Sequence, residues 1–167
     1  MLETSTDTEL QSEVIDIRRV AKVTKGGKNL SFRVTVVVGD GAGRVGVGKG
    51  NTREIPLAIQ QGIRDAQRNM IYVPLKDGTI PHEVEGKFKA ARVILRPAYR
   101  GTGIIAGTTV GTICRLAGIR DILTKALGST NPLTLARATL VALKQLKTPE
   151  EVARLRDKKV EEILEEE

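Results

Sequence analysis

The chain has 167 residues, which is room for one ordinary domain or two small ones. Hydrophobic residues make up 40% and aromatic residues only 2%, so a core must be built mainly from Val, Ile, Leu and Ala. Cys114 is the only cysteine, which excludes an intramolecular disulfide and a thiolate-based zinc site. The polar, acidic start is unlike a signal peptide, and no apolar run reaches the ~18 residues of a membrane span. We therefore expect a soluble, cytoplasmic protein without a membrane partner.

The net charge of +7 is unevenly distributed. Residues 1–13 hold four acidic residues and no Lys or Arg, and residues 149–167 hold eight acidic residues against four basic ones. The segment 14–148 therefore carries 23 basic and 8 acidic residues, a net charge of +15. Such a segment repels itself unless a polyanion neutralises it, and nucleic acid is the polyanion that this predicts.

The first part of the chain is predicted to form three strands. Residues 1–13 are too polar to bury and are expected to be a disordered acidic arm. An extended segment begins at Val14, and Gly26-Gly27 predicts a turn. Apolar and polar residues alternate over 30–38, which indicates a half-buried strand. A glycine-rich turn then leads to a third strand that begins at Val45.

A helix is predicted after the third strand. Asn51 is its candidate cap, and Pro56 is tolerated in its first turn. Spacings of three and four residues predict an apolar stripe along this helix. The stripe consists of Ile55, Ile59, Ile63, Ala66 and Met70. Residues 14–75 are therefore expected to form one β-β-β-α domain.

A second α+β domain is predicted over residues 83–148, after a connection through Pro81. A hairpin over 84–95 comes first, followed by a short helix that Gly118 ends. A strand over 119–127 and a helix opened by Asn131-Pro132, buried on two sides, complete it. Thr148 to Glu151 form a capping box that opens an acidic C-terminal helix or tail over 149–167.

Two glycine motifs resemble nucleotide-binding sequences. Gly41 to Gly46 fits the dinucleotide fingerprint, but it leads into a strand rather than a helix. Gly43 to Lys49 supplies seven positions of a phosphate-binding loop, but Gly50 stands where a magnesium-binding Ser or Thr is needed. Both motifs are therefore interpreted as turn and strand glycines, and nucleotide hydrolysis remains an alternative.

No catalytic or metal-binding group is predicted. His82 is the only histidine and lies in a connecting segment, so we interpret it as a surface residue. Glu83 and Glu85 alternate as on any solvated strand, and Cys114 lies on an apolar helix face as a small buried hydrophobe. We expect no cofactor, no metal, no small-molecule substrate and no enzymatic activity.

The basic residues near the glycines predict an RNA-binding surface. Long cationic side chains neutralise phosphates, and glycines let the backbone approach them. A pair of aromatic residues for stacking on bases is lacking, with only Phe32 nearby, so structured or double-helical RNA is favoured over single strands. The alternative is a set of ordinary solvated faces. The predicted contact residues are Arg18, Lys22, Lys25, Gly26, Gly27, Lys28, Arg44, Lys49 and Arg53.

Several separated blocks of the sequence, in order over about Val14 to Leu155, resemble bacterial-type small-subunit ribosomal protein five. The blocks are Gly27–Val34, Val36–Asp40, Gly43–Gly50, Glu54–Pro56, Arg68–Met70, Asp77–Ile80, Pro97-Ala98, Gly101–Gly107 and Gly128–Pro132.

The resemblance implies a double-stranded-RNA-binding-like first domain and a second domain of the type named after this family. It implies binding to 16S-type ribosomal RNA, support of subunit assembly, and neighbours that are ribosomal proteins four and eight. It also implies a place near the decoding region and the path of incoming mRNA, and a role in translational accuracy. Lys25, Gly26, Gly27 and Lys28 would be the loop beside the spectinomycin site, and Gly101, Thr102 and Gly103 would lie near protein four.

Two departures from the family pattern bear on the second domain. Gly111 stands where many relatives have Arg, and Cys114-Arg115 replaces a more usual Leu-Glu. They affect the expected partner contact rather than the family. The sequence thus predicts a permanent ribosomal component, with a free-standing duplex-RNA binder as the first alternative and the nucleotide hydrolase as the second.

Overall fold

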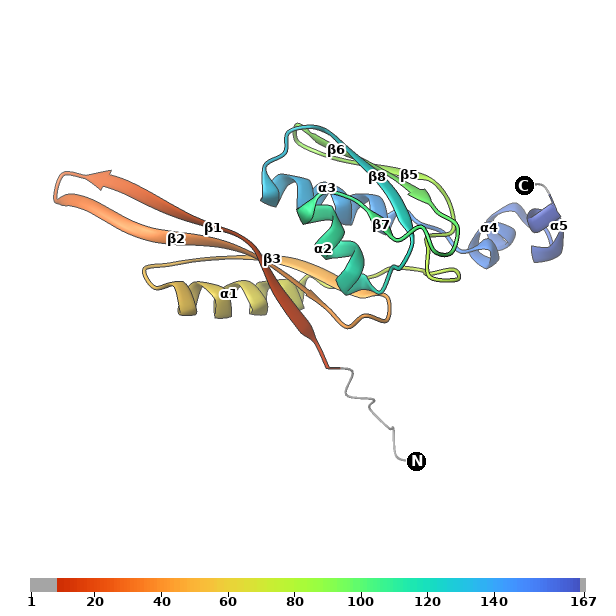
Figure 1. The fold of residues 1–167 in the computed structure, drawn as a ribbon, viewed down its shortest axis with the longest axis horizontal. Coiled ribbons are helices and arrows are strands. Elements are labelled where there is room, and N and C mark those ends of the chain that lie inside the picture. Colours follow the sequence, from red (N-terminus) through yellow and green to blue (C-terminus); the bar gives the residue numbers. More distant parts are fainter. Residues whose placement is uncertain (1–8, 166–167) are drawn as a thin grey trace, which may run out of the picture.

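The structure, a computed structural model, describes residues 9–165 of the chain. They form two four-stranded sheets with helices packed against them, which confirms the predicted α+β class (Figure 1). The first sheet is antiparallel and follows chain order. The elements of this unit are β1 (Gln11–Thr24), β2 (Gly27–Gly39), β3 (Arg44–Thr52), α1 (Ile55–Arg68) and β4 (Ile71–Tyr72).

The predicted acidic arm, residues 1–13, lies largely outside the described residues. β1 nevertheless begins at Gln11, and its first three residues pair with β2 from Gly39 back to Val37. The prediction of disorder is therefore wrong for Gln11 to Glu13, because they satisfy their backbone hydrogen bonds in the sheet.

α1 packs on the first sheet through small residues. Its buried positions are Ala58, Gly62 and Ala66, which recur every four residues along one side. The predicted stripe is therefore displaced: Ile59 and Ile63 are only partly buried, and Ile55 is exposed. The predicted cap is also wrong. Glu54 occupies the N-cap position, while Asn51 belongs to β3.

The glycines of β3 explain why small residues line this helix. A Cβ atom at Gly46, Gly48 or Gly50 would lie 2.3, 2.2 and 1.8 Å, respectively, from a carbonyl oxygen of α1. No real Cβ atom could occupy those positions without moving the helix. The three glycines therefore allow α1 and β3 to pack backbone against backbone.

β2 is buried on both faces over its second half. Val34, Val36 and Val38 pack beneath α1, and Thr35 and Val37 point the other way, yet all five are at most 2% exposed. The predicted half-buried strand is therefore wrong for this stretch. Val37 belongs to the same hydrophobic core as the second unit, so the two units share a continuous interior and the boundaries at 14–75 and 83–148 stay predictions.

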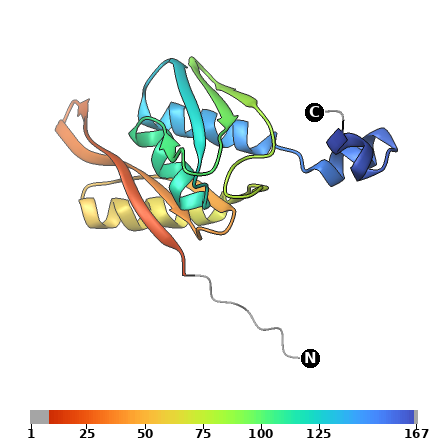
Figure 2. The same ribbon diagram turned by 45° about the vertical axis from the view of Figure 1, so that its right-hand side comes forward.

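The second unit confirms the predicted hairpin, helix and strand order. Its sheet has the order β5-β6-β8-β7, with β7 parallel to β8, and α2 and α3 pack against one face (Figures 1 and 2). Gly118 ends α2 in the left-handed conformation, as predicted, with φ 92°. The elements are β5 (Val84–Phe88), β6 (Ala91–Pro97), β7 (Ile104–Ile105), α2 (Thr108–Ala117), β8 (Ile122–Gly128) and α3 (Pro132–Lys144).

Two short helices, α4 (Pro149–Arg156) and α5 (Val160–Glu165), follow α3. Of the predicted capping box, the Thr148 cap is confirmed, because its hydroxyl accepts a hydrogen bond of 3.2 Å from the Glu151 amide. These helices and the tip of the β1–β2 hairpin lie at opposite ends of the molecule (Figure 1). Among residues 9–165, no helix is long and apolar enough to cross a membrane.

Candidate nucleic-acid interface

The first sheet is covered unequally on its two faces. α1 covers one face beneath Val34, Val36 and Val38, and the second unit covers the inner part of the other face at Val37 and Val47. Beyond these residues the β1–β2 hairpin projects from the body (Figure 1). Every residue from Ala21 to Leu30 is exposed. The hairpin thus offers a long surface that no other part of the described chain occupies.

Four basic residues share the sheet face turned away from α1, and we call them the basic stripe. Arg18 lies directly opposite Arg33 in the pairing of β1 with β2. Lys22 lies four residues nearer the tip on the same face, and Lys49 of β3 is paired with Thr35. The basic stripe therefore crosses three strands and consists of Arg18, Lys22, Arg33 and Lys49.

The charge of the basic stripe is only partly balanced. Asp16 forms an ion pair of 2.8 Å with Arg18, and both side chains are accessible to water. Like charges directly opposite each other destabilise an antiparallel pair, so the juxtaposition of Arg18 and Arg33 is unfavourable on its own. A bound polyanion would turn this repulsion into attraction.

Arg33 is the residue of the basic stripe that the predicted contact set lacks. In the sequence it stands among the polar residues that alternate with the buried valines of 30–38, so it looks like an ordinary solvated position. The alternation of polar and apolar residues over 30–38 separates Arg33 from the face of Val34 and Val36. Only the strand pairing reveals that Arg18 is its neighbour.

The predicted hairpin loop is confirmed as a turn, with Lys25 and Gly26 between β1 and β2. Gly27 has φ 125°, a conformation that favours glycine, whereas a Cβ at Gly26 would meet nothing within 4 Å. The Thr24 hydroxyl donates to the Gly27 carbonyl at 3.2 Å and closes the turn. Lys28 lies opposite Val23, on the face of the hairpin that does not carry the basic stripe.

Arg44 is not brought together with the hairpin residues. It begins β3 beside Tyr72 of β4, whereas Arg53 directly follows Thr52, which pairs with Phe32 of β2. Arg44 and Arg53 therefore lie at opposite ends of the same strand, roughly 30 Å apart. The predicted contact set is spread over two places: the hairpin with Lys49 and Arg53, and the edge of the sheet near β4 at Arg44.

Both nucleotide-like glycine motifs have structural explanations. Gly41 and Gly43 hold a turn whose amides donate to the Leu116 and Ala117 carbonyls at 2.9 and 2.8 Å, which joins the two units. The Gly43–Gly50 segment continues through β3, where Gly46, Gly48 and Gly50 contact α1. The three glycines of β3 are not available to approach phosphates, contrary to the role expected for them, because the backbone of α1 already occupies the space.

The loop predicted to face protein four, residues 101–103, is held in shape by a buried side chain. The buried Asp121 carboxylate accepts hydrogen bonds from the amides of Gly101 and Gly103 at 3.1 and 2.9 Å. Both glycines have positive φ, and Gly101 and Thr102 are exposed. The loop thus has a defined shape with an open outer side.

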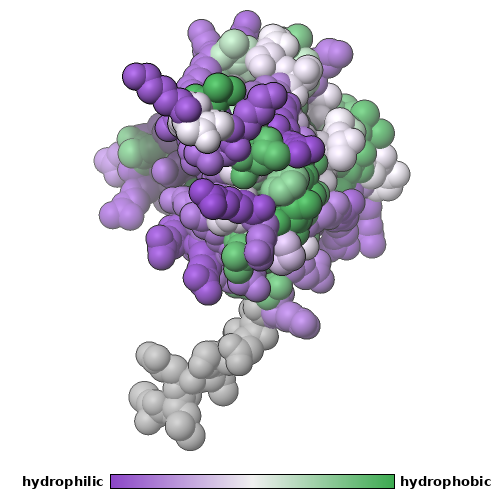
Figure 3. Space-filling model, turned by 90° about the vertical axis from the view of Figure 1, so that its left-hand side faces the viewer, coloured by the Kyte–Doolittle hydropathy of each residue, from purple (hydrophilic) through white to green (hydrophobic). Residues whose placement is uncertain are grey.

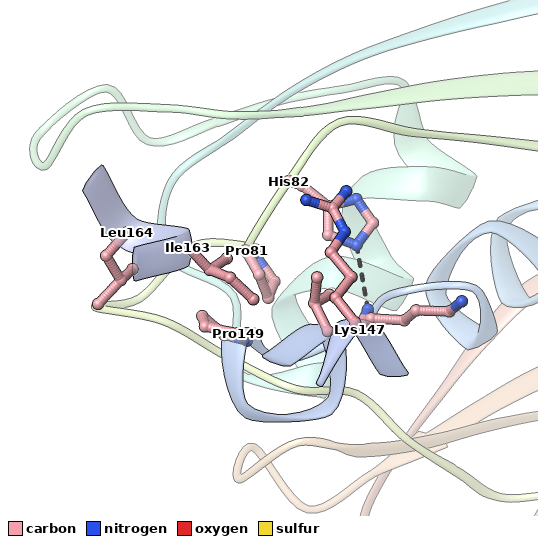
Figure 4. A pocket seen from close by; sticks show the side chains of 8 residues that line it. Pro81, His82, Lys147, Pro149, Ile163 and Leu164 are labelled. Atoms are coloured by element: carbon pink, nitrogen blue, oxygen red, sulfur yellow. Dashed lines mark hydrogen bonds between the residues drawn. The ribbon is translucent and has the colours of Figure 1, made fainter. Parts of the chain in front are cut away.

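His82, interpreted from the sequence as a surface residue, is half-buried and makes two hydrogen bonds. Its Nε2 accepts a hydrogen bond of 3.0 Å from the Lys147 amide, which requires the proton on Nδ1, 2.9 Å from the Glu83 carbonyl. It lines a cavity of about 310 Å³ together with Pro81, Pro149, Ile163 and Leu164 (Figure 4). His82 thereby links the connecting segment to the chain that enters α4.

Cys114 is fully buried in the core, as predicted, and burial raises the pKa of its thiol to about 12. Next to it, Arg115 forms an exposed ion pair with Glu13 of β1. The Cys114-Arg115 departure therefore supplies a core residue and a contact between the two units. At Gly111, an added Cβ would make ordinary contacts at 3.7 Å or more, so nothing in the packing requires glycine there.

The hairpin end of the molecule has a mainly polar surface, as a phosphate-binding surface requires. Viewed from that side, hydrophilic side chains predominate and smaller hydrophobic patches lie among them (Figure 3). Among the described residues, no group of three or more His, Cys, Asp or Glu side chains lies close enough to hold a metal ion.

Comparison with known protein families matches both units. Residues 10–74 match the family described as "Ribosomal protein S5, N-terminal domain". Residues 86–156 match the family described as "Ribosomal protein S5, C-terminal domain".

Similar proteins from several bacteria carry the name "Small ribosomal subunit protein uS5". The one from Thermotoga neapolitana is 59% identical over 155 residues, which cover 93% of this chain and 87% of that protein. The one from Thermosipho africanus is 51% identical over 160 residues, covering 96% and 91%. The one from Rubrobacter xylanophilus is 52% identical over 153 residues, covering 92% and 76%.

Proposed function

This chain belongs to the ribosomal protein S5 family, and we propose that it binds the 16S-type RNA of the small ribosomal subunit through the basic stripe and the hairpin tip. As a member of this family it is a structural constituent of the small ribosomal subunit and not an enzyme. Its binding mechanism would be phosphate neutralisation and fit to the shape of folded RNA, without bond chemistry.

The observation that carries the proposal is the placement of Arg18 opposite Arg33 on an uncovered sheet face. Lys22 and Lys49 extend the same face, and Asp16 is the carboxylate paired with it. A folded chain gains nothing for itself from such a pair of like charges. A phosphate backbone running across the three strands would contact all four cations.

The hairpin tip would reach further into folded RNA than the stripe. Lys25, Gly26, Gly27 and Lys28 are all exposed and no other element covers them, which suits a loop inserted between RNA helices beside the spectinomycin site. At that place the chain would lie near the decoding region and incoming mRNA, and would support assembly and translational accuracy.

Neighbouring proteins would bind the second unit. The exposed loop at Gly101, Thr102 and Gly103, held in shape by Asp121, offers open backbone to protein four. Protein eight would be a further neighbour. The assignment of protein four rests on family membership and on the exposure of Gly101 and Thr102, and that of protein eight rests on family membership alone.

Ribosome association is tested by sedimentation of a cell lysate through a sucrose gradient after a high-salt wash, with this chain detected in each fraction. We expect one copy per small subunit. Recovery only at the top of the gradient would contradict the proposal and leave a free-standing RNA binder.

The role of the basic stripe is tested by the double substitution Arg18→Ala and Arg33→Ala. We expect weaker binding to a 16S RNA fragment, with the slope of log K against log salt reduced by roughly 0.7–0.9 for each lost phosphate contact. The matched control replaces Arg64 and Arg154, which are exposed on α1 and α4, by Ala and removes the same net charge. Equal slopes for the two double variants would exclude the stripe as the contact surface.

A further inference from the structure

A groove between the two units brings together aromatic and cationic residues that are far apart in the sequence. It has a volume of about 690 Å³ and runs between the segment 68–72 and α3. Tyr72 and Phe88 are its aromatic residues, and Arg68, Arg137 and Lys144 are its cations. None of the residues that line it, all in the described part of the chain, is acidic. We propose that this groove binds one unpaired nucleotide of an RNA strand, with its base on Tyr72 and its phosphates on the three cations.

Tyr72 is suited to act as the platform for a base. It is 71% exposed, although it is held in β4 by pairing with Arg44. Its ring passes over Gly43, where a Cβ would lie 3.4 Å from Cε2 of the tyrosine. The strand pairing thus places Tyr72 with its ring beside Gly43, while most of the side chain stays open to solvent. Every base has a π-face, so stacking on such a ring tolerates any base.

Phe88 positions a cation at the other side of the groove. The guanidinium carbon of Arg137 lies 5.6 Å from the centre of the Phe88 ring, and Lys89 Nζ lies 5.7 Å from it. Both distances are within the range of cation–π attraction. Phe88 is therefore engaged with cations and is not itself the stacking platform, whereas Arg137 is held where it can meet a phosphate.

The charge of the groove favours RNA over a protein partner. The core of a protein-binding interface is depleted of charged residues, whereas this groove has three cations among its lining residues. Here the lining charges are all positive, and Arg44 adds a fourth cation beside Tyr72 in the strand pairing. An aromatic ring flanked by cations is the arrangement that binds unpaired nucleotides.

This inference deepens the proposed RNA-binding role by adding a second kind of contact. The basic stripe would bind folded RNA through its phosphates, whereas the groove would bind a nucleotide whose base is not paired. The aromatic partner that the sequence lacks near the glycine-rich strands is supplied from β4. The two contacts lie on different elements, so each is tested separately.

The test uses the full chain and a single-stranded RNA hexanucleotide that carries 2-aminopurine, titrated by fluorescence at low salt. We expect Tyr72→Ala to weaken binding by roughly 5- to 150-fold, since that is the effect of losing one base–aromatic stack. Tyr72→Phe, which keeps the ring, should bind within about threefold of the parent chain. The matched control is Tyr99→Ala, because Tyr99 is 92% exposed and lies outside the groove.

Further results bear directly on the proposal. Arg137→Ala with Lys144→Ala should lower the salt dependence of hexanucleotide binding, whereas Arg64→Ala with Arg154→Ala, which removes the same charge from α1 and α4, should leave it nearly unchanged. Equal affinities for Tyr72→Ala and the parent chain, an equal loss for Tyr99→Ala, or no binding of the hexanucleotide would each overturn the proposal. A groove that serves a protein partner would give the last of these results. Binding of a 16S RNA fragment through the basic stripe is measured separately and does not depend on these outcomes.

Discussion

The two ends of the first sheet use similar residues for opposite purposes. At the hairpin end, Gly26 and Gly27 are exposed between lysines, and nothing packs against them. At the inner end, Gly48 and Gly50 flank Lys49 on β3, and the space where their side chains would be is filled by the backbone of α1. Glycines next to basic residues thus occur both at a proposed RNA contact and in the tightest packing of the protein.

The difference lies in what occupies the space beside each glycine. In β3 glycine is required for steric reasons, because the small residues of α1 pack directly against the strand. In the hairpin the requirement is conformational and applies to Gly27, which has φ 125°. The two glycine groups can therefore be separated by experiment, because one controls stability and the other controls the shape of an exposed turn.

The largest expected effect comes from Gly50→Ala. Its Cβ would lie 1.8 Å from the Ala58 carbonyl oxygen, so α1 must move away from the sheet. We expect the free energy of unfolding to fall by about 3 kcal/mol or more, at the upper end for overpacking. Urea unfolding followed by circular dichroism measures it.

Gly26→Ala is the matched control at the hairpin end. Its Cβ would meet nothing within 4 Å and its φ is not positive, so stability should change by less than about 0.5 kcal/mol. Similar losses of stability in the two variants would refute the distinction between the two ends of the sheet.

A second expected effect concerns the core behind the inner end, where Cys114 and Val37 share one hydrophobic cluster. Burial raises the thiol pKa from 9.0 to about 12. Above pH 9 the unfolded chain therefore loses the thiol proton while the folded chain keeps it. This contribution to stability falls as pH rises, by about 1.4 kcal/mol per pH unit, until the pKa of the folded state is reached.

The measurement compares urea unfolding at pH 8.5 and pH 10 for the parent chain and for Cys114→Ala. The substitution lowers stability at both pH values, because it leaves a small cavity. Only the parent chain carries the thiol contribution to the pH dependence. Identical pH dependence in the two proteins would show that the thiol is accessible to water in the folded state.

Local patterns were sufficient for much of the fold. The hairpin turn, the left-handed end of α2 at Gly118 and the cap at Thr148 follow from single residues whose conformational preferences need no distant partner. The second-unit hairpin also follows from local alternation. These features were predicted because the residues that determine each of them lie close together in the sequence.

Features that depend on distant contacts were not predicted correctly. The helix stripe of bulky residues, including Ile55 and Ile59, is displaced because the glycines of β3 draw the small residues of α1 toward the sheet. β2 looks half-buried because nothing in 30–38 indicates that a second unit will cover Val37.

The sequence was sufficient to predict most residues of the candidate site, but not which of them lie next to each other. Arg18, Lys22 and Lys49 are in the predicted set, but strand pairing brings Arg33 to them and leaves Arg44 at the sheet edge. The aromatic residue beside a cationic groove, Tyr72, could not be anticipated because Arg137 is 65 residues away in the chain.

The smallest expected effect is a gain of stability at the hairpin end. Arg33→Thr removes one of two like charges directly opposite each other, keeps the Arg18–Asp16 ion pair, and introduces a residue that favours strands. We expect the free energy of unfolding to rise by roughly 0.2–1 kcal/mol at low salt and the gain to shrink at high salt.

Arg19→Thr is the control for this substitution. It removes the same charge, but Arg19 lies opposite Phe32 on the other face of the sheet. If Arg33→Thr stabilises the chain while weakening RNA binding, Arg18 and Arg33 repel each other in the free protein and serve RNA binding rather than the fold. A loss of stability greater than that of Arg19→Thr would instead mean that Arg33 serves the fold, and the basic stripe would lose its central residue.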